Sequence, residues 1–397
     1  MTDPGSSAIA HQAMPEAMLI ILGAGASHDC LPSNIQDSMV VNGTVLGGIP
    51  LRELRPPLTQ QLAGTGTLTN WFTSRWDSAV PAISHLRATL TKTPSSSGAQ
   101  RVQTLESALR EYEDGSLLDP ARRRHLLALS FYFRDLFSAC TDYVHAHGVG
   151  GGDTNQLRLL GQVRQWGGSK AQRTVTFVSF NYDLILEQAM TMYSQFNPLE
   201  LSDYLNDPLS RLLKPHGSAC WHWMVPSPPT DSLLSVVRPI DPARSEGQRA
   251  IERALVDEID RNNLVLRGIA YSSVIGDSAE NLIPALALPM DGKDAYVWPA
   301  EQRQALDELQ GRVTRLMTIG WRALEPEFVP LLGSLLHKSV KVLIVAGDKD
   351  GDNDAEAVVQ RLRETCAPAG INRWRTYGQG FTGLLERSEE LKWFLED

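Results

Sequence analysis

Four short segments carry the residue types from which a catalytic site could be assembled, and each follows an apolar stretch of the chain. They are Gly23-Ala24-Gly25-Ala26-Ser27, Ser179-Phe180-Asn181-Tyr182-Asp183, Lys214-Pro215-His216-Gly217 and Gly320-Trp321. The amide of Asn181 is both donor and acceptor, so it can hold two polar partners at once. His216 has a reference pKa of about 6.5, which suits it to accept a proton. These types point to acid–base chemistry beside a glycine-rich turn.

The glycine-rich segment follows the apolar run 19–22, which predicts a short buried strand that ends at Gly23. The turn Gly23-Ala24-Gly25 has almost no side chains, so its backbone N–H groups can come close to an anion. Ser27 and the residues after it are expected to open a helix whose positive end faces the same spot. Doubly wound domains receive the diphosphate of a dinucleotide in this way, although the third glycine of the dinucleotide fingerprint is absent here.

Each of the polar side chains also has a structural explanation. Asn181 and Asp183 follow a strand predicted at residues 175–179, where open α/β sheets bind ligands, but one of them is expected to cap the helix predicted at 184–192. His216 lies on a Pro-His-Gly turn that leaves its ring accessible, and a lone histidine is more often structural than catalytic. His222, between two tryptophans, is interpreted as a packed sheet residue.

The elements that must position these residues alternate between strands and helices, which predicts an α/β fold with a doubly wound, Rossmann-like parallel sheet. A further strand is predicted at 340–346. Helices are expected at 104–112, 121–146, 155–166, 301–316, 327–337, 355–364 and 383–395, with a mixed-charge helix near 248–260. We interpret residues 17–397 as a single domain with a helical insertion at 58–168 and a second insertion at 225–300. The acidic run 347–354 lacks the terminal glutamate of a calcium loop and is interpreted as a loop with a helix cap.

The composition excludes several classes of protein. The chain has 397 residues, a net charge of −9 and 42% hydrophobic residues, which is typical of a globular domain and argues against a general nucleic-acid surface. No apolar run approaches the ~20 residues of a membrane span, and residues 1–16 form a polar arm unlike a signal peptide. We therefore expect a cytoplasmic protein. The four cysteines contain no Cys-x-x-Cys pair, so neither a zinc module nor any other metal site is expected.

Taken in order, the four segments resemble the sirtuin-like family, and particularly its bacterial NAD-hydrolysing branch in antiphage defence. In that family a Gly-Ala-Gly-x-Ser turn holds the NAD phosphates, which corresponds to residues 23–27 of this chain. The Thr-x-Asn-x-Asp segment corresponds to Ser179, Asn181 and Asp183, and the catalytic His-Gly to His216 and Gly217. A late turn that contacts the adenosine half corresponds to Gly320 and Trp321, where tryptophan replaces serine.

The resemblance implies that NAD is a substrate and that Asn181, His216 and Asp183 are catalytic. Asn181 would hold a ribose hydroxyl and the incoming water, and Asp183 would accept from the nicotinamide amide. The binding residues would be Gly23, Ala24, Gly25, Ala26, Ser27, Ser179, Gly217, Gly320 and Trp321. Sirtuins that deacylate lysine also carry a zinc module and a Gly-Ile-Pro-Asp-Phe-Arg run, and only Gly48-Ile49-Pro50 and Arg52 are similar here. Water is therefore the expected acceptor.

The implied function is hydrolysis of NAD to ADP-ribose and nicotinamide, switched on by a trigger. Two alternatives stay open, a protein deacylase and a non-catalytic NAD or ADP-ribose sensor that signals through oligomerisation. The resemblance further implies a homo-oligomer and a separately encoded partner such as a HerA-type ATPase, and less readily a short Argonaute. The sequence does not distinguish linear from cyclic ADP-ribose as the product.

Overall fold

The computed structural model describes most of the chain. The described residues are 16–31, 55–58, 61–62, 80–90, 105–115, 119–147, 153–169, 173–193, 196, 198, 200–207, 210–225, 264–266, 281–288, 297–347, 351–366, 371 and 373–396. The arm predicted at residues 1–16 lies outside them except for Glu16, whose carboxylate accepts from Arg173 Nε at 2.8 Å. The helix predicted near 248–260 also lies outside them, as do residues 48–52 and 348–350.

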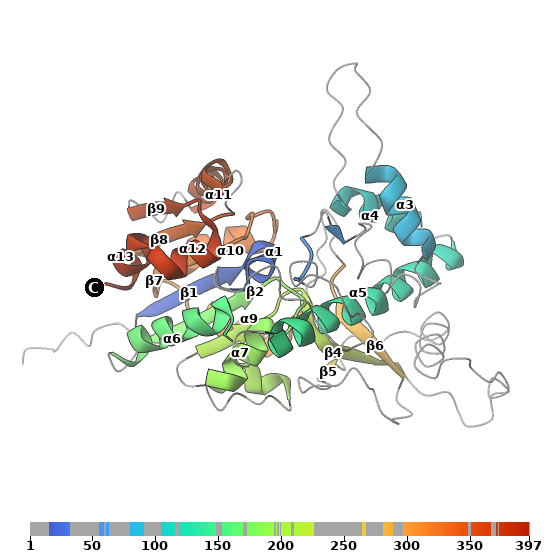
Figure 1. The fold of residues 1–397 in the computed structure, drawn as a ribbon, viewed down its shortest axis with the longest axis horizontal. Helices are drawn as coiled ribbons and strands as arrows, with labels where there is room; N and C mark the ends of the chain where they lie inside the picture. Colours follow the sequence, from blue (N-terminus) through green and yellow to red (C-terminus); the bar gives the residue numbers. More distant parts are fainter. Residues whose placement is uncertain are drawn as a thin grey trace, which may run out of the picture.

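A six-stranded parallel sheet with the order β3-β2-β1-β7-β8-β9 forms the centre of the molecule (Figure 1). Its strands are β1 Ala17–Leu22, β2 Thr174–Ser179, β3 Ser210–Leu213, β7 Val313–Ile319, β8 Leu336–Val345 and β9 Arg373–Tyr377. Numbered within this sheet alone, the order is 3-2-1-4-5-6, as in doubly wound dinucleotide-binding domains. The predicted Rossmann-like fold class is thereby confirmed. The chain leaves β1 toward β2 and later returns to its other side at β7.

Helices cover both faces of the sheet. Alternate residues of β1 point to opposite sides, so each face carries apolar side chains that a layer of helices buries. Met18, Ile20 and Leu22 face one core and Leu19 and Ile21 the other. The first core contains α5 Pro120–His147, α6 Asn155–Gly168, α7 Ile185–Tyr193, α12 Gly380–Arg387 and α13 Glu389–Leu395. The second contains α9 Ala300–Asp307, α10 Phe328–Leu335 and α11 Gly351–Cys366.

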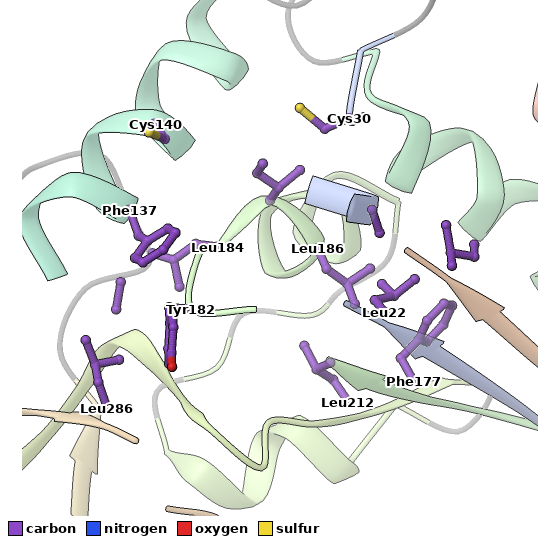
Figure 2. Close-up of a cluster of buried hydrophobic side chains, with 14 of the residues drawn as sticks. Leu22, Cys30, Phe137, Cys140, Phe177, Tyr182, Leu184, Leu186, Leu212 and Leu286 are labelled. Atoms are coloured by element: carbon purple, nitrogen blue, oxygen red, sulfur yellow. The ribbon is translucent and has the colours of Figure 1, made fainter. Parts of the chain in front are cut away.

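Most of the described residues between β1 and β2 are helical, including those within the insertion predicted at 58–168. α3 Val80–Leu90 and α4 Leu105–Asp114 pack at the end of α5 that is farther from the sheet (Figure 1). α6 instead packs against β2 and α7. It is therefore the helix that connects β1 to β2 across the sheet, and the end of the predicted insertion belongs to the core. Figure 2 shows Phe137 of α5 beside Tyr182 and Leu184, beyond the end of β2.

The second predicted insertion contributes strands to a small antiparallel sheet with the order β5-β4-β6. β4 is Gly217–Val225, β5 is Leu264–Leu266 and β6 is Asn281–Leu286. His222 is buried in β4, so its interpretation as a packed sheet residue is confirmed. β4 follows the His216 turn directly, and this sheet therefore supports that turn.

Several boundary predictions near the C-terminus were wrong. The helix predicted at 301–316 ends at Asp307, and β7 begins at Val313 after Gly311 turns the chain at a φ of 67°. β9 was missed, because Arg373, Trp374 and Arg375 hide the apolar alternation of a strand. The helix predicted at 383–395 is two helices, because the Ser388 side chain caps α13 by accepting from Leu391 N.

All four cysteines are free and buried. Within the described ranges, no three His, Cys, Asp or Glu side chains gather as they would around a metal ion. None of the helices described is both long and apolar enough to cross a membrane.

Candidate functional site

The four sequence segments meet at the carboxyl edge of the large sheet. Parallel strands place their following loops at one edge, and ligands bind there where the strand order reverses. Here that point lies between β1 and β7. The segments that follow β1, β2, β3 and β7 contain Ser27, Asn181, His216 and Gly320 respectively. The contacts described below join all four loops.

Gly23, Gly25 and Gly320 let the first and last of these loops touch through their backbones. Gly23 N donates to Ile319 O at 3.0 Å, and Gly25 N donates to Gly320 O at 3.2 Å. Gly320 has a φ of 58°, and a Cβ added there would lie 2.5 Å from Gly25 Cα. The expectation that these glycine amides face an anion is therefore corrected. They hold β1 to β7 instead, and the absence of Cβ atoms serves this close packing.

The helix after the glycine turn also differs from the prediction. α1 Ala24–His28 begins at Ala24, so Ser27 lies near its end and does not open it. It ends at Asp29, whose carboxylate accepts from Thr382 N at 3.0 Å and Thr382 Oγ1 at 2.5 Å. Asn155 Nδ2 donates to the Asp29 carbonyl at 2.8 Å. These contacts with α12 and α6 stop the helix after little more than one turn, so its dipole is small.

Asn181 joins the second loop to the first. Its Nδ2 donates to Gly23 O at 2.9 Å and to Ser27 Oγ at 2.8 Å, and the side chain is buried. The carbonyl of Gly23 can only accept, which fixes the amide orientation. Both donor hydrogens of the Asn181 amide are therefore bonded within the protein, and its Oδ1 is the atom that can accept from a ligand. Ser179 is buried behind it, and its Oγ accepts from Asn181 N at 3.3 Å.

Asp183 caps a helix with one oxygen and keeps the other for a different use. Its Oδ1 accepts from Ile185 N at 3.2 Å at the start of α7, so the cap expected of one of the two residues is confirmed for Asp183. Its Oδ2 is buried with no hydrogen-bond partner among the described residues. A buried acceptor in this state is costly unless a water molecule or a ligand donates to it. The negative charge of Asp183 also affects neighbouring groups. Burial raises the pKa values of the Cys30 and Cys140 thiols, and the Asp183 carboxylate raises them further.

His216 is the third residue of a tight turn. Gly217 N donates to Lys214 O at 3.0 Å, which closes the turn, and Gly217 has a φ of 80°. A Cβ on Gly217 would collide with the carbonyl oxygen of Ala285 in β6. Val297 N donates to Pro215 O at 2.8 Å and Ala287 N to His216 O at 3.0 Å. The described part of the second insertion therefore fixes the backbone on which His216 stands.

The imidazole of His216 is partly buried between two aromatic rings. The Phe180 ring meets it edge-on at 4.9 Å between centroids, and the Tyr182 ring lies at 6.2 Å and 26°. Burial lowers the pKa of His216 to about 4, opposed by a hydrogen bond to the backbone of Phe180. The ring is therefore neutral near pH 7, and a neutral imidazole has one N–H donor and one unprotonated nitrogen that can accept a proton.

This lowered pKa predicts a pH dependence of stability. The unfolded imidazole has a pKa of about 6.5, and burial places it at about 4 in the folded protein. Between these values the unfolded chain binds more protons, so His216 makes the free energy of unfolding rise with pH and fall on acidification. Urea unfolding at about pH 4.5 and about pH 7 should show a smaller difference for His216→Gln than for the wild type. An equal difference in both would contradict the lowered pKa of the His216 ring.

The side chain of Trp321 packs inside the protein. Its indole stacks on Phe180 at 5.9 Å between centroids with an angle of 4°, and its Nε1 donates to Glu325 Oε2 at 2.7 Å. The side chain is buried against Phe328 in the second core. Its predicted ligand contact stays a prediction, and in this arrangement the backbone of Gly320 and Trp321 would make it. Phe180 thus joins the loops of His216 and Trp321, a role that the sequence reasoning missed.

Lys214, Glu187 and Ser218 were also missed, although they lie directly beside the predicted site residues. The Lys214 ammonium and Glu187 carboxylate form a fully buried ion pair at 2.9 Å. Ser218 Oγ donates to the same Glu187 oxygen at 2.8 Å. A signal existed in the sequence, because Lys214 follows an apolar strand and Glu187 interrupts an apolar helix.

The chain was compared with known proteins by sequence and, separately, by structure. No family model and no curated protein matches the sequence. Solved structures that align include a Sir2 homologue in complex with NAD, at 11% identity over 89% of this chain and 91% of that chain, with a TM-score of 0.32. A mutant Sir2 homologue with 2′-O-acetyl ADP-ribose aligns at 10% identity over 90% and 95%, with a TM-score of 0.36. Similarity at this level carries no weight for fold or function, which rest on the residues and topology of this chain.

Proposed function

We propose that this protein binds NAD and hydrolyses its nicotinamide–ribose bond, giving ADP-ribose and nicotinamide. The observation that carries the proposal is the meeting of Asn181, the glycine turn and a neutral His216 at the strand-order reversal of a dinucleotide-type sheet. The order of the four segments resembles the sirtuin-like family and supports the same proposal. Water is the proposed acceptor, since the sequence lacks the paired cysteines and most of the Gly-Ile-Pro-Asp-Phe-Arg run of the deacylating sirtuins.

The proposed reaction breaks the bond between the ribose C1′ and the nicotinamide nitrogen. Nicotinamide leaves with the bonding electron pair and becomes neutral, while positive charge develops on the ribose as an oxocarbenium ion. Water adds to C1′, and its proton passes to the unprotonated nitrogen of the neutral His216 ring and then to solvent. A neutral imidazole is required for this step, and the pKa of about 4 supplies one at physiological pH. The products are ADP-ribose, nicotinamide and one proton.

The remaining residues would orient the substrate. Asn181 Oδ1 would accept from a ribose hydroxyl or from the incoming water, and Asp183 Oδ2 would accept from the carboxamide of nicotinamide. Gly23 to Ser27 and Gly320 would lie along the diphosphate and adenosine half. Because the Gly23 and Gly25 amides are already paired, the glycines would contribute close approach more than hydrogen bonds. Ser179 would support Asn181, and Gly217 would leave room beside the His216 ring.

Asn181→Ala is expected to lower the rate of nicotinamide release by at least about 100-fold, because it removes both the ribose or water contact and the link to Gly23 and Ser27. Chromatographic measurement of nicotinamide, with the melting temperature measured in parallel, checks this. Asn206→Ala is the matched control, since Asn206 is exposed and bonds only to Asp203 among the described residues. Full activity of Asn181→Ala would remove Asn181 from the site.

The acceptor can be identified with ¹⁸O-labelled water. Hydrolysis predicts that the label appears at C1′ of ADP-ribose, which mass spectrometry detects. Addition of an acetylated peptide tests the alternative enzyme, because a deacylase would form acetyl-ADP-ribose. Saturable NAD binding without any product would identify a sensor and overturn the hydrolase proposal.

We further propose that the hydrolase acts in the cytoplasm as an effector of antiphage defence by depleting NAD. Continuous hydrolysis would exhaust the cell's own NAD, so a trigger must control the site. The resemblance supports a homo-oligomer that works with a separately encoded HerA-type ATPase or, less readily, a short Argonaute. Co-purification with such a partner, followed by comparison of nicotinamide release in its presence and absence, tests this part independently of the chemistry.

A further inference from the structure

The buried ion pair between Lys214 and Glu187 lies outside the proposed chemistry. Both side chains are 0% exposed, and Lys214 Nζ lies 2.9 Å from Glu187 Oε1. Removing two charges from water costs about as much as their attraction returns, so such a pair is a poor source of stability. Its position must therefore be explained by what it connects.

The pair connects the two loops that carry Asn181 and His216. Lys214 Nζ also donates to the carbonyl of Asp183 at 2.8 Å, two residues after Asn181. Glu187 Oε1 also accepts from Ser218 Oγ at 2.8 Å. Lys214 and Ser218 lie two residues before and two residues after His216. A single carboxylate oxygen on α7 thus holds both sides of the His216 turn, and the ammonium holds that turn to the Asn181 loop.

Several other contacts of the turn lead away from the Asn181 loop. Gln302 Oε1 accepts from Lys214 N at 2.9 Å, and Val297 and Ala287 hold Pro215 and His216, so these contacts tie the turn to the segment 287–302. Toward the Asn181 loop, the backbone offers Ala219 N to Tyr182 O at 2.8 Å. That bond and the hydrogen bond of the His216 ring to the backbone of Phe180 join the two loops, and the Lys214 and Ser218 side chains add further points of attachment.

We infer that Lys214, Glu187 and Ser218 are positioning residues, which set the His216 turn against the Asn181–Asp183 loop. The inference rests on the proposed function for its kinetic consequence, because misplacing a base by about 1 Å can cost about 100-fold in rate. The structural part of the inference, the placement of the His216 ring, can be measured whether or not the protein hydrolyses NAD.

The principal test is the double variant Lys214→Met/Glu187→Leu, which removes both charges at similar volume. We expect a melting temperature within a few degrees of wild type, a kcat lower by about 10- to 100-fold and a KM for NAD that changes little. The control is Arg211→Met/Glu308→Gln, which removes an exposed ion pair from the same strand region. Wild-type kcat in the folded double variant would overturn the inference.

A second readout separates this inference from the proposed function. In ¹⁵N-histidine spectra, the signals that disappear in His216→Ala belong to the His216 ring, and they should shift in the double variant but not in the control. If the wild type shows no turnover under any condition, the proposed function fails. The His216 signals then still show whether the Lys214–Glu187 pair positions the ring. Ser218→Ala serves where the double variant does not fold, with a smaller expected shift, and unchanged His216 signals in it would overturn the inference.

Discussion

His216→Ala is expected to lower nicotinamide release from NAD by about 100-fold to 10,000-fold, the range for loss of a general base. The half-buried ring contacts Phe180 and Tyr182 and its removal leaves the turn backbone bonds in place, so the protein should stay folded. NAD affinity should change little, because the base acts in the transition state. Steady-state kinetics and calorimetric NAD titration measure both quantities.

The matched control for this variant is His337→Ala. His337 lies at the start of β8 and bonds to Ser339, and it contacts none of the four loops in the described part of the chain. It should keep wild-type kcat and KM. Undiminished turnover by folded His216→Ala would remove the base from the proposed mechanism, whereas an equal loss in both variants would indicate a general effect of replacing histidine.

Gly320→Ala is expected to destabilise the fold by about 3 kcal/mol or more, the largest stability effect we predict. The φ of 58° costs an L-residue about 1–2 kcal/mol. The added Cβ would also lie 2.5 Å from Gly25 Cα and Ala26 N, and backbone atoms cannot move aside as a flexible side chain can. Separating β1 from β7 would open the site, so NAD binding should weaken together with the loss of stability.

Gly311→Ala separates the two causes. Gly311 has a φ of 67°, but nothing lies within 4 Å of the place that a Cβ would occupy there, so it carries the backbone strain alone. Its cost should be about 1–2 kcal/mol, with NAD binding unchanged. Equal losses in denaturant unfolding for the two variants would contradict the close-packing role of Gly320.

The sequence predicted the parts of the fold that rest on local patterns. The apolar runs at β1, β2 and β8 and the long amphipathic α5 lie close to where they were expected. Residues 313–316 of β7 were assigned to the end of a helix, because a buried central strand and a buried helix share the same apolar composition. β9 was missed because its strand character depends on pairing with β8, which no short window of sequence contains.

The candidate site was predictable as a set of residues but not as a set of contacts. Asn181, Asp183 and His216 were expected on loops that follow strands, and the structure has them there, while their roles stay predictions. The hydrogen bond from Gly25 N to Gly320 O joins two segments almost 300 residues apart, so no local sequence pattern predicts it. Glu187 interrupts an apolar helix, but that pattern does not show which residue pairs with it, and a glutamate in a helix is usually solvated.

The most direct test of the central claim is to follow NAD and nicotinamide by chromatography, with purified protein alone and with lysate from phage-infected cells added. The proposed site predicts that nicotinamide and ADP-ribose accumulate together as NAD disappears in at least one condition, and that His216→Ala abolishes this. NAD that stays bound and intact in both conditions would contradict the hydrolase and identify the protein as a sensor.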